Sequence, residues 1–215
     1  MKIIGLDESQ FTSYAFNIDQ QSDQLVEITD GHEESVYALD EIGYGPDNQD
    51  AIKKDYNDAK AIEEALEKQL NADNARIKSL LQLMLDLKKT MNALKFRINQ
   101  AFSPAKEYAQ KALDGATKAF GALESDLENM IKKVASSQQQ LGDINVKLTA
   151  LLLLTCDPNP PAENVLKAHQ YLRDVKKTQS SMSTVQIMFD ALYGDFLMHE
   201  VDVVSGIEEA GHILR

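Results

Sequence analysis

Imidazole and thiol side chains, which carry much of the nucleophilic and metal chemistry of proteins, are scarce in this chain of 215 residues. They are His32, His169, His199, His212 and Cys156. A Cys–His nucleophile pair needs both side chains within hydrogen-bond reach, and only His169 lies close to Cys156, across the turn that follows it. We favour a core position at a helix end for Cys156 instead. A single cysteine also excludes an internal disulfide and a thiolate metal cluster.

Carboxylate and imidazole pairs at metal-ligand spacing are also few. Glu209-Ala-Gly-His212 is one Glu-x-x-His unit, an element that di-iron helical bundles use twice, and the sequence holds no second copy. Asp195 and His199, four residues apart, are better explained as an ion pair on one helix face. Residues 47–58 are acidic but lack the spacing and central glycine of a calcium loop. We therefore predict no metal, no cofactor and no catalytic residue.

Other ligand classes are disfavoured by the charge and by the glycines. The 10 Gly are scattered and form no phosphate-binding loop, so no small-molecule substrate is predicted. The formal net charge of −12 argues against nucleic acid, because phosphate neutralisation needs an excess of Lys and Arg. Residues 1–46 hold one basic and ten acidic residues, a net of −9, so most of the acidity lies there.

The elements that must position these side chains are long helices. With 10 Gly and 5 Pro, the chain lacks the turn residues that a barrel or sandwich requires. Ser103-Pro104 is an N-cap residue followed by a first-turn proline, and the proline-rich stretch 157–161 ends one helix and begins another. Each segment would be about 80 Å long as an unbroken helix. The predicted helices cover about 47–102, 103–156 and 161–215.

Apolar residues in all three segments recur at alternating spacings of four and three, which is typical of coiled-coil-like packing. Short connections make neighbouring helices antiparallel. We therefore predict an all-α fold, an elongated antiparallel (up-down-up) bundle of three long helices over 47–215. The apolar series are Ile77, Leu80, Met84, Leu87, Met91, Leu94, Ile98 and Ala101; Ala109, Leu113, Ala116, Phe120, Leu123, Leu127, Met130, Val134, Ser137, Leu141, Ile144, Leu148, Leu151 and Thr155; and Met182, Val185, Phe189, Leu192, Phe196, His199 and Val203.

Two polar features follow from aligning the helices in this topology. Residues 69–74, 136–140 and 179–181 fall at one height and form a polar belt, either a solvated, loosely packed layer or a hinge that sets the register. Six basic residues in 76–102 lie beside six acidic residues in 190–215. Opposite charges there select the register, and we expect high salt to weaken that end of the bundle more than the other.

Residues 1–46 form a small acidic segment that we expect to pack on one end of the bundle. Helical spacing favours a helix over about 8–29 and a second over 33–42. The β-branched residues of "YAFNI" and "QLVEIT" instead favour a two-stranded hairpin, and the sequence leaves both open.

The strongest candidate contact site is the run Leu148–Leu154, whose leucines cover the whole circumference of a helix. Such a helix must be buried all round or meet a partner or a membrane. Residues 1–46 either pack over it permanently or act as a cover that is displaced. The run is too short to span a bilayer, which takes about 20 residues. The predicted contact residues are Leu148, Leu151, Leu152, Leu153 and Leu154.

These observations favour a non-enzymatic scaffold or adaptor that binds protein partners, or further copies of itself, through its long faces or its apolar end. The alternative is a secreted helical toxin or secretion-system translocator component that exposes 148–154 to a membrane. The expected architecture is similar to spectrin-like bundles and to such toxins and translocators, a likeness of shape that transfers no function. With no signal-peptide pattern at its start, the chain is expected to be cytoplasmic or exported without a cleaved signal.

Overall fold

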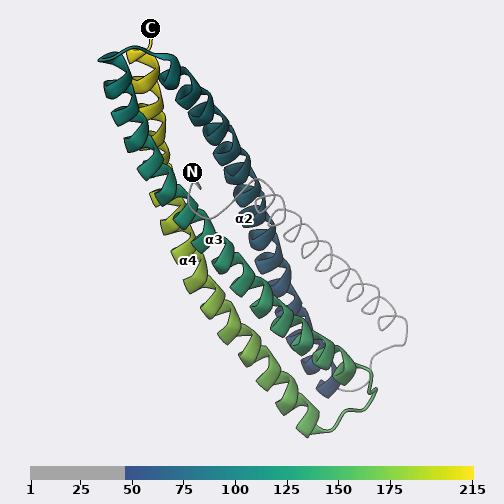
Figure 1. Ribbon diagram of the computed structural model, residues 1–215. Coiled ribbons are helices and arrows are strands. Elements are labelled where there is room, and N and C mark those ends of the chain that lie inside the picture. The colour runs from purple at the N-terminus through teal and green to yellow at the C-terminus, as the bar shows by residue number, and fades with distance from the viewer. Residues whose placement is uncertain (1–46) are drawn as a thin grey trace. The chain divides into compact units, whose positions relative to one another are not determined.

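The fold is all-α, as predicted, and consists of three long helices that pack on one another (Figure 1). The computed structural model describes residues 47–215, and this part of the chain contains no strand. The helices are α2 (Asp47–Gln100), α3 (Ala105–Thr155) and α4 (Ala162–Ile213). They have 54, 51 and 52 residues. The predictions made for residues 1–46, helix or hairpin, lie outside the described residues.

Local hydrogen bonds hold the two connections between the helices. Before α3, Ser103 Oγ lies 3.2 Å from a carboxylate oxygen of Glu107, and the Pro104 carbonyl accepts hydrogen bonds from the backbone N–H groups of Glu107 and Tyr108. Between α3 and α4, the Asp157 carboxylate accepts a bond of 2.9 Å from the Asn159 N–H, which forms an Asx turn. Both proline-containing stretches therefore separate helices, as the sequence predicts. The predicted capping at the start of α3 was wrong in detail, because Ser103 bonds the Glu107 side chain and α3 begins at Ala105, after Pro104.

The predicted apolar series of α2 and α3 form the core. In α2 the seven residues from Ile77 to Ile98 are all buried, and Ala101, which follows the helix, is half-buried. In α3 every apolar member of the series is buried, together with Thr155, while Ser137 is half-buried. The 3.5-residue repeat of apolar residues therefore identified the inward faces of α2 and α3 correctly.

The described residues form two compact units. The first unit contains residues 74–133 and 188–215, and the second contains 47–73 and 134–187. In the second unit, the start of α2 is bonded to the connection between α3 and α4. Gln49 Nε2 donates to the Thr155 carbonyl at 2.9 Å, and Asn48 Nδ2 donates to the Pro160 carbonyl at 3.0 Å. The first bond satisfies the carbonyl of the last residue of α3, which the helix itself leaves free, and the second satisfies a carbonyl of the connection.

Candidate partner-binding surface

Helix α4 buries a narrower stripe than the other two helices. One row, which repeats every seven residues, is buried throughout. Val185, Leu192 and His199, which alternate with the residues of this row, were predicted as core but are only half-buried. A narrow inner stripe leaves apolar residues of α4 on its outer side. The buried row is Ala168, Val175, Met182, Phe189, Phe196, Val203 and Ala210.

The outer side of α4 in the first unit carries a cluster of exposed apolar residues. Leu197, Met198 and Val201 are 41%, 63% and 66% exposed, and Val204 beside them is half-buried. Single exposed apolar residues are ordinary, but a cluster on one helix face indicates a contact surface. We call Leu197, Met198, Val201 and Val204 the α4 patch. A shallow hollow of about 460 Å³ includes Leu197, Val201 and Val204 in its wall, along with Glu200, Ser205 and Glu208.

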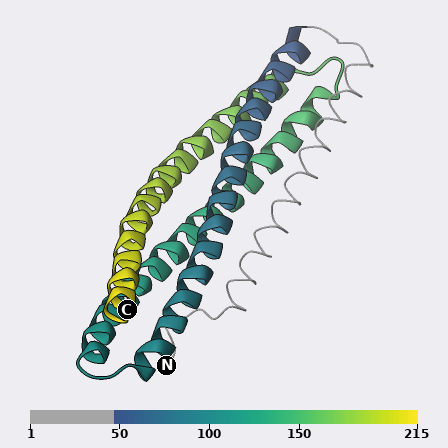
Figure 2. The same ribbon diagram turned by 90° about the horizontal axis from the view of Figure 1, so that it is seen from above.

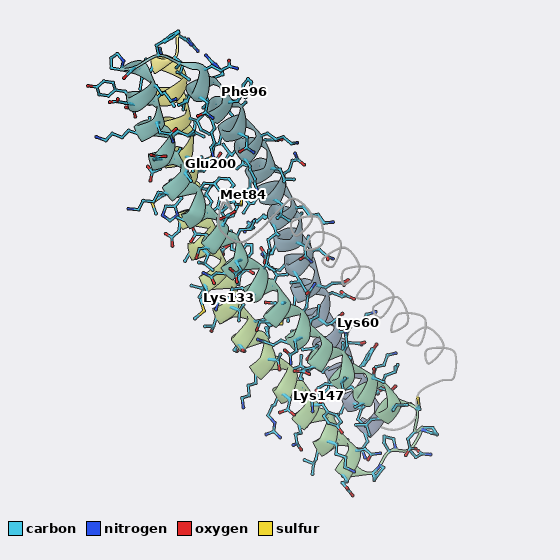
Figure 3. All side chains as sticks on the ribbon, viewed as in Figure 1. Lys60, Met84, Phe96, Lys133, Lys147 and Glu200 are labelled. Carbon is cyan, nitrogen blue, oxygen red and sulfur yellow. The ribbon has the colours of Figure 1, made fainter. Side chains whose placement is uncertain are left out.

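The border of the α4 patch is acidic. Between Lys177 and Arg215 the sequence contains no Lys or Arg and six acidic residues. Two of them, Glu200 and Glu208, line the hollow itself (Glu200 is labelled in Figure 3). An apolar stripe with a border of one charge sign favours partners of the opposite sign.

Contacts made by three residues, Arg76, His199 and Gly206, fix the rotation of α4 in the first unit and so hold the patch outward. Arg76 Nη1 donates to Asp190 at 3.0 Å, and the Arg76 guanidinium lies 5.4 Å from the Tyr193 ring centroid. This is one pair between the predicted basic and acidic stripes. His199 Nδ1 lies 2.7 Å from Asp126 Oδ2 on α3. The expected local pair of His199 with Asp195 is therefore not the contact that forms.

Gly206 provides the third contact, because it brings α4 close to α3. A Cβ atom at this position would lie 2.9 Å from the Ala116 Cβ and 3.1 Å from the Ala112 carbonyl oxygen. Backbone atoms of α3 therefore occupy the space that any side chain at 206 needs. The sequence gives no sign of this role, since Gly206 stands beside an apolar heptad position like several other glycines.

The predicted contact residues from 148 to 154 are distributed around the helix. Leu148 and Leu151 are fully buried in the second unit, Leu152 and Leu154 are half-buried, and Leu153 is 68% exposed. The leucine run therefore places two side chains in the core of the second unit and one in solvent. The predicted binding of a partner or a membrane by residues 148–154 stays a prediction.

Two of the histidines considered for chemistry are paired with carboxylates of other helices. His169 Nδ1 contacts the buried Asp55 carboxylate on α2. Cys156 is exposed, so the expected core position for it was wrong. In residues 47–215, no three His, Cys, Asp or Glu side chains are arranged to hold a metal ion. Asp55 and Asp126, the partners of the two paired histidines, were not identified from the sequence. In the sequence, Asp55 and Asp126 are placed relative to the apolar residues in the same way as carboxylates that lie on the surface.

Members of the predicted polar belt meet around a cavity of about 320 Å³ in the second unit. Asp73 is buried and its Oδ1 accepts bonds of 3.3 Å from Gln69 Nε2 and from Gln186 Nε2. Ser137 of α3 also lines the cavity, while α4 contributes Ser183 and Gln186 in place of residues 179–181. The buried Asp73 occupies a core position of α2.

The carboxyl group of Glu124 has a strongly raised pKa. It lies on α3 in the first unit, and both of its carboxylate oxygens are buried with no hydrogen-bond partner. Burial raises its pKa from 4.5 to about 7, and the positive charge of Lys88 on α2 partly opposes this. We assign this buried carboxyl group an effect on stability.

Comparisons with protein family models, with characterised proteins and with solved structures give no match to this chain. None of the described helices is long and apolar enough to cross a membrane. Inferences about function therefore rest on the exposed surfaces and internal contacts of the two units.

Proposed function

We propose that the protein is a non-enzymatic helical scaffold or adaptor that binds a partner helix through the α4 patch. The observation that carries this proposal is the cluster of exposed apolar residues on α4, a helix whose rotation is fixed by contacts with α2 and α3. An amphipathic helix that lays its apolar side on such a stripe is a common mode of recognition. The acidic border favours a partner with Lys or Arg beside its apolar face.

We also propose that the three helices follow an up-down-up path along the whole described chain. Contacts inside each unit support it, because residue numbers rise together on α2 and α4 and run oppositely on α3 and α4. The pairs are Asp55–His169 and Asp73–Gln186 in the second unit, and Asp126–His199 and Ala116–Gly206 in the first. In this topology each helix keeps one long face free for partners.

Self-association through the α4 patch is the less favoured form of the proposal. A symmetric dimer places the same patch of both copies face to face, so Glu200 and Glu208 of each copy approach each other. Like charges at an interface disfavour pairing. A basic partner encounters no such repulsion.

We expect Val201→Glu to weaken binding of a basic amphipathic helix at least about tenfold, which corresponds to about 1.4 kcal/mol. The probe is a synthetic helical peptide with leucines at spacings of three and four and lysines on both borders, titrated by fluorescence anisotropy. The added charge removes apolar contact and leaves a carboxylate in the interface. Val201 is 66% exposed, so the fold is expected to be retained.

The matched control is Val146→Glu, because Val146 on α3 is 67% exposed and lies in the second unit. This variant is expected to bind the peptide like the unmodified protein. Equal losses in both variants, or no binding by the unmodified protein, would count against the proposal. Sedimentation velocity over a range of concentrations tests self-association, and a dimer that Val201→Glu dissociates would replace the adaptor form of the proposal.

A further inference from the structure

The end of the first unit formed by the connection between α2 and α3 presents three exposed aromatic side chains. Phe96, Phe102 and Tyr108 are 65%, 90% and 65% exposed. Exposed phenylalanines are costly in water unless they have a contact to make. The other phenylalanines of residues 47–215 are all at most 2% exposed: Phe120, Phe189 and Phe196.

The three aromatic residues belong to one chain reversal. Phe96 lies in the last turns of α2 (Figure 3), Phe102 in the connection, and Tyr108 in the first turn of α3. The Phe102 carbonyl accepts a bond of 3.1 Å from the Lys106 N–H, which ties the connection to the start of α3. Figures 1 and 2 both show this connection beside the C-terminal end of α4. We call Phe96, Phe102 and Tyr108 with the residues between them the aromatic end.

The aromatic end lies within the most basic part of an acidic chain. Residues 88–111 contain six Lys and Arg and one acidic residue, Glu107, a net of +5 in a protein of net charge −12. Arg97, Lys106 and Lys111 are exposed, and none of them forms an ion pair with another described residue. Acidic side chains also approach this end, because Glu209 shares a groove with Lys111, and Glu208 shares one with Arg97.

Local charge decides what this end attracts. Charges farther away than about 8–10 Å are largely screened at physiological salt, so the acidity of the rest of the chain acts weakly here. Anionic lipid headgroups are attracted by clustered Lys and Arg, and aromatic rings insert at the level of those headgroups. Both features occur together at the aromatic end. Phe102, the most exposed of the three, projects from a chain reversal, whereas Tyr108 also lines the groove that holds Lys111 and Glu209.

We propose that the aromatic end docks on an anionic membrane surface, with Phe96, Phe102 and Tyr108 entering the interface and Arg97 and Lys106 contacting lipid headgroups. This binding lies in the plane of the headgroups and requires no spanning helix. It uses a different part of the first unit from the α4 patch, so either proposal can fail while the other stands. It also differs from the alternative in which residues 148–154 meet a membrane.

The test uses the absence of tryptophan from the chain. In Phe102→Trp the introduced indole is the only one, and its emission is expected to shift to shorter wavelength when vesicles of phosphatidylcholine with about 30% phosphatidylglycerol are added. In co-sedimentation, Phe102→Ser is expected to lower the partition coefficient onto these vesicles about tenfold. The double variant Arg97→Gln with Lys106→Gln is expected to lower it by a similar factor, and vesicles of phosphatidylcholine alone are expected to bind weakly.

Leu153→Ser is the matched control, since Leu153 is a 68% exposed apolar residue in the second unit. It is expected to bind vesicles like the unmodified protein, and circular dichroism checks that every variant is folded. Three results would overturn the proposal. They are no emission shift in Phe102→Trp, a loss in Leu153→Ser as large as that in Phe102→Ser, and an equal shift with soluble inositol hexakisphosphate, which would show anion binding without a membrane.

Discussion

Replacing Glu124 by glutamine is expected to raise the free energy of unfolding by about 2 kcal/mol at pH 8 and to change it little at pH 5. Glu124 is 5% exposed, and both carboxylate oxygens lack hydrogen-bond partners. Above its folded-state pKa of about 7 the side chain is a buried anion, stabilised only in part by Lys88. Glutamine has the same shape and no charge, so it removes that cost.

The direction of the pH effect follows from the protons bound in each state. Burial raises the pKa of Glu124 to about 7 from 4.5, the value expected for the unfolded chain. Between these values the folded protein holds a proton that the unfolded chain has released, so folding is favoured at low pH. The contribution of Glu124 to stability is therefore lost as the pH rises from 4.5 to about 7. Urea denaturation at pH 5 and pH 8, followed by circular dichroism, measures it.

Glu128→Gln is the control for this experiment. Glu128 lies one turn further along α3, where its exposed carboxylate forms an ion pair of 2.7 Å with Lys132. Exposed pairs of this kind contribute about 0–1 kcal/mol, so this variant is expected to change stability by less than 1 kcal/mol at both pH values. An increase for Glu124→Gln that is the same at pH 5 and pH 8 would show that the charge of Glu124 is not the cause.

The sequence predicted the helices and most of the core because both depend on periodic, local information. Proline positions and capping residues mark the helix ends, and the spacing of apolar residues gives the inward faces of α2 and α3. Glu124 shows where this reasoning stops. It directly follows the core residue Leu123, and the apolar spacing alone does not show that a neighbouring helix also covers it.

The candidate surfaces were harder to predict for a related reason. The leucine run at 148–154 attracted attention by its composition, yet Leu148 and Leu151 complete the core. The α4 patch and the aromatic end consist of ordinary residue types, and only their exposure distinguishes them. Val201 and Val203 are the same residue two positions apart on α4, yet one is 66% exposed and the other is fully buried. The rotation of α4 decides this difference, and contacts far apart in the sequence set that rotation.

The largest loss of stability from adding a single methyl group is expected at Gly206. We expect Gly206→Ala to lower the free energy of unfolding by about 2 kcal/mol, because the new Cβ would lie 2.9 Å from the Ala116 Cβ and 3.1 Å from the Ala116 backbone nitrogen. Backbone atoms of α3 cannot rotate away, so the two helices must separate locally. Urea denaturation at one pH measures the change.

Gly194→Ala is the matched control, because Gly194 lies in the same helix and the same unit but a Cβ there meets no atom within 4 Å. Alanine is the better helix former, so this variant is expected to gain about 0.5–1 kcal/mol. Both substitutions change helix propensity equally, and the difference between them, about 3 kcal/mol, isolates the close approach of α3 and α4. Equal stability of the two variants would contradict that approach.

Gly206→Ala also connects the packing of α4 to the proposed function. The α4 patch lies within three turns of Gly206, and its outward orientation depends on α4 resting against α3 at that point. If the helices separate there, the patch changes its orientation, and Gly206→Ala is expected to weaken binding of the basic helical peptide although Gly206 is not part of the patch. Gly194→Ala is expected to bind the peptide normally. Normal binding by Gly206→Ala, together with its lower stability, would mean that the patch recognises its partner without the support of α3.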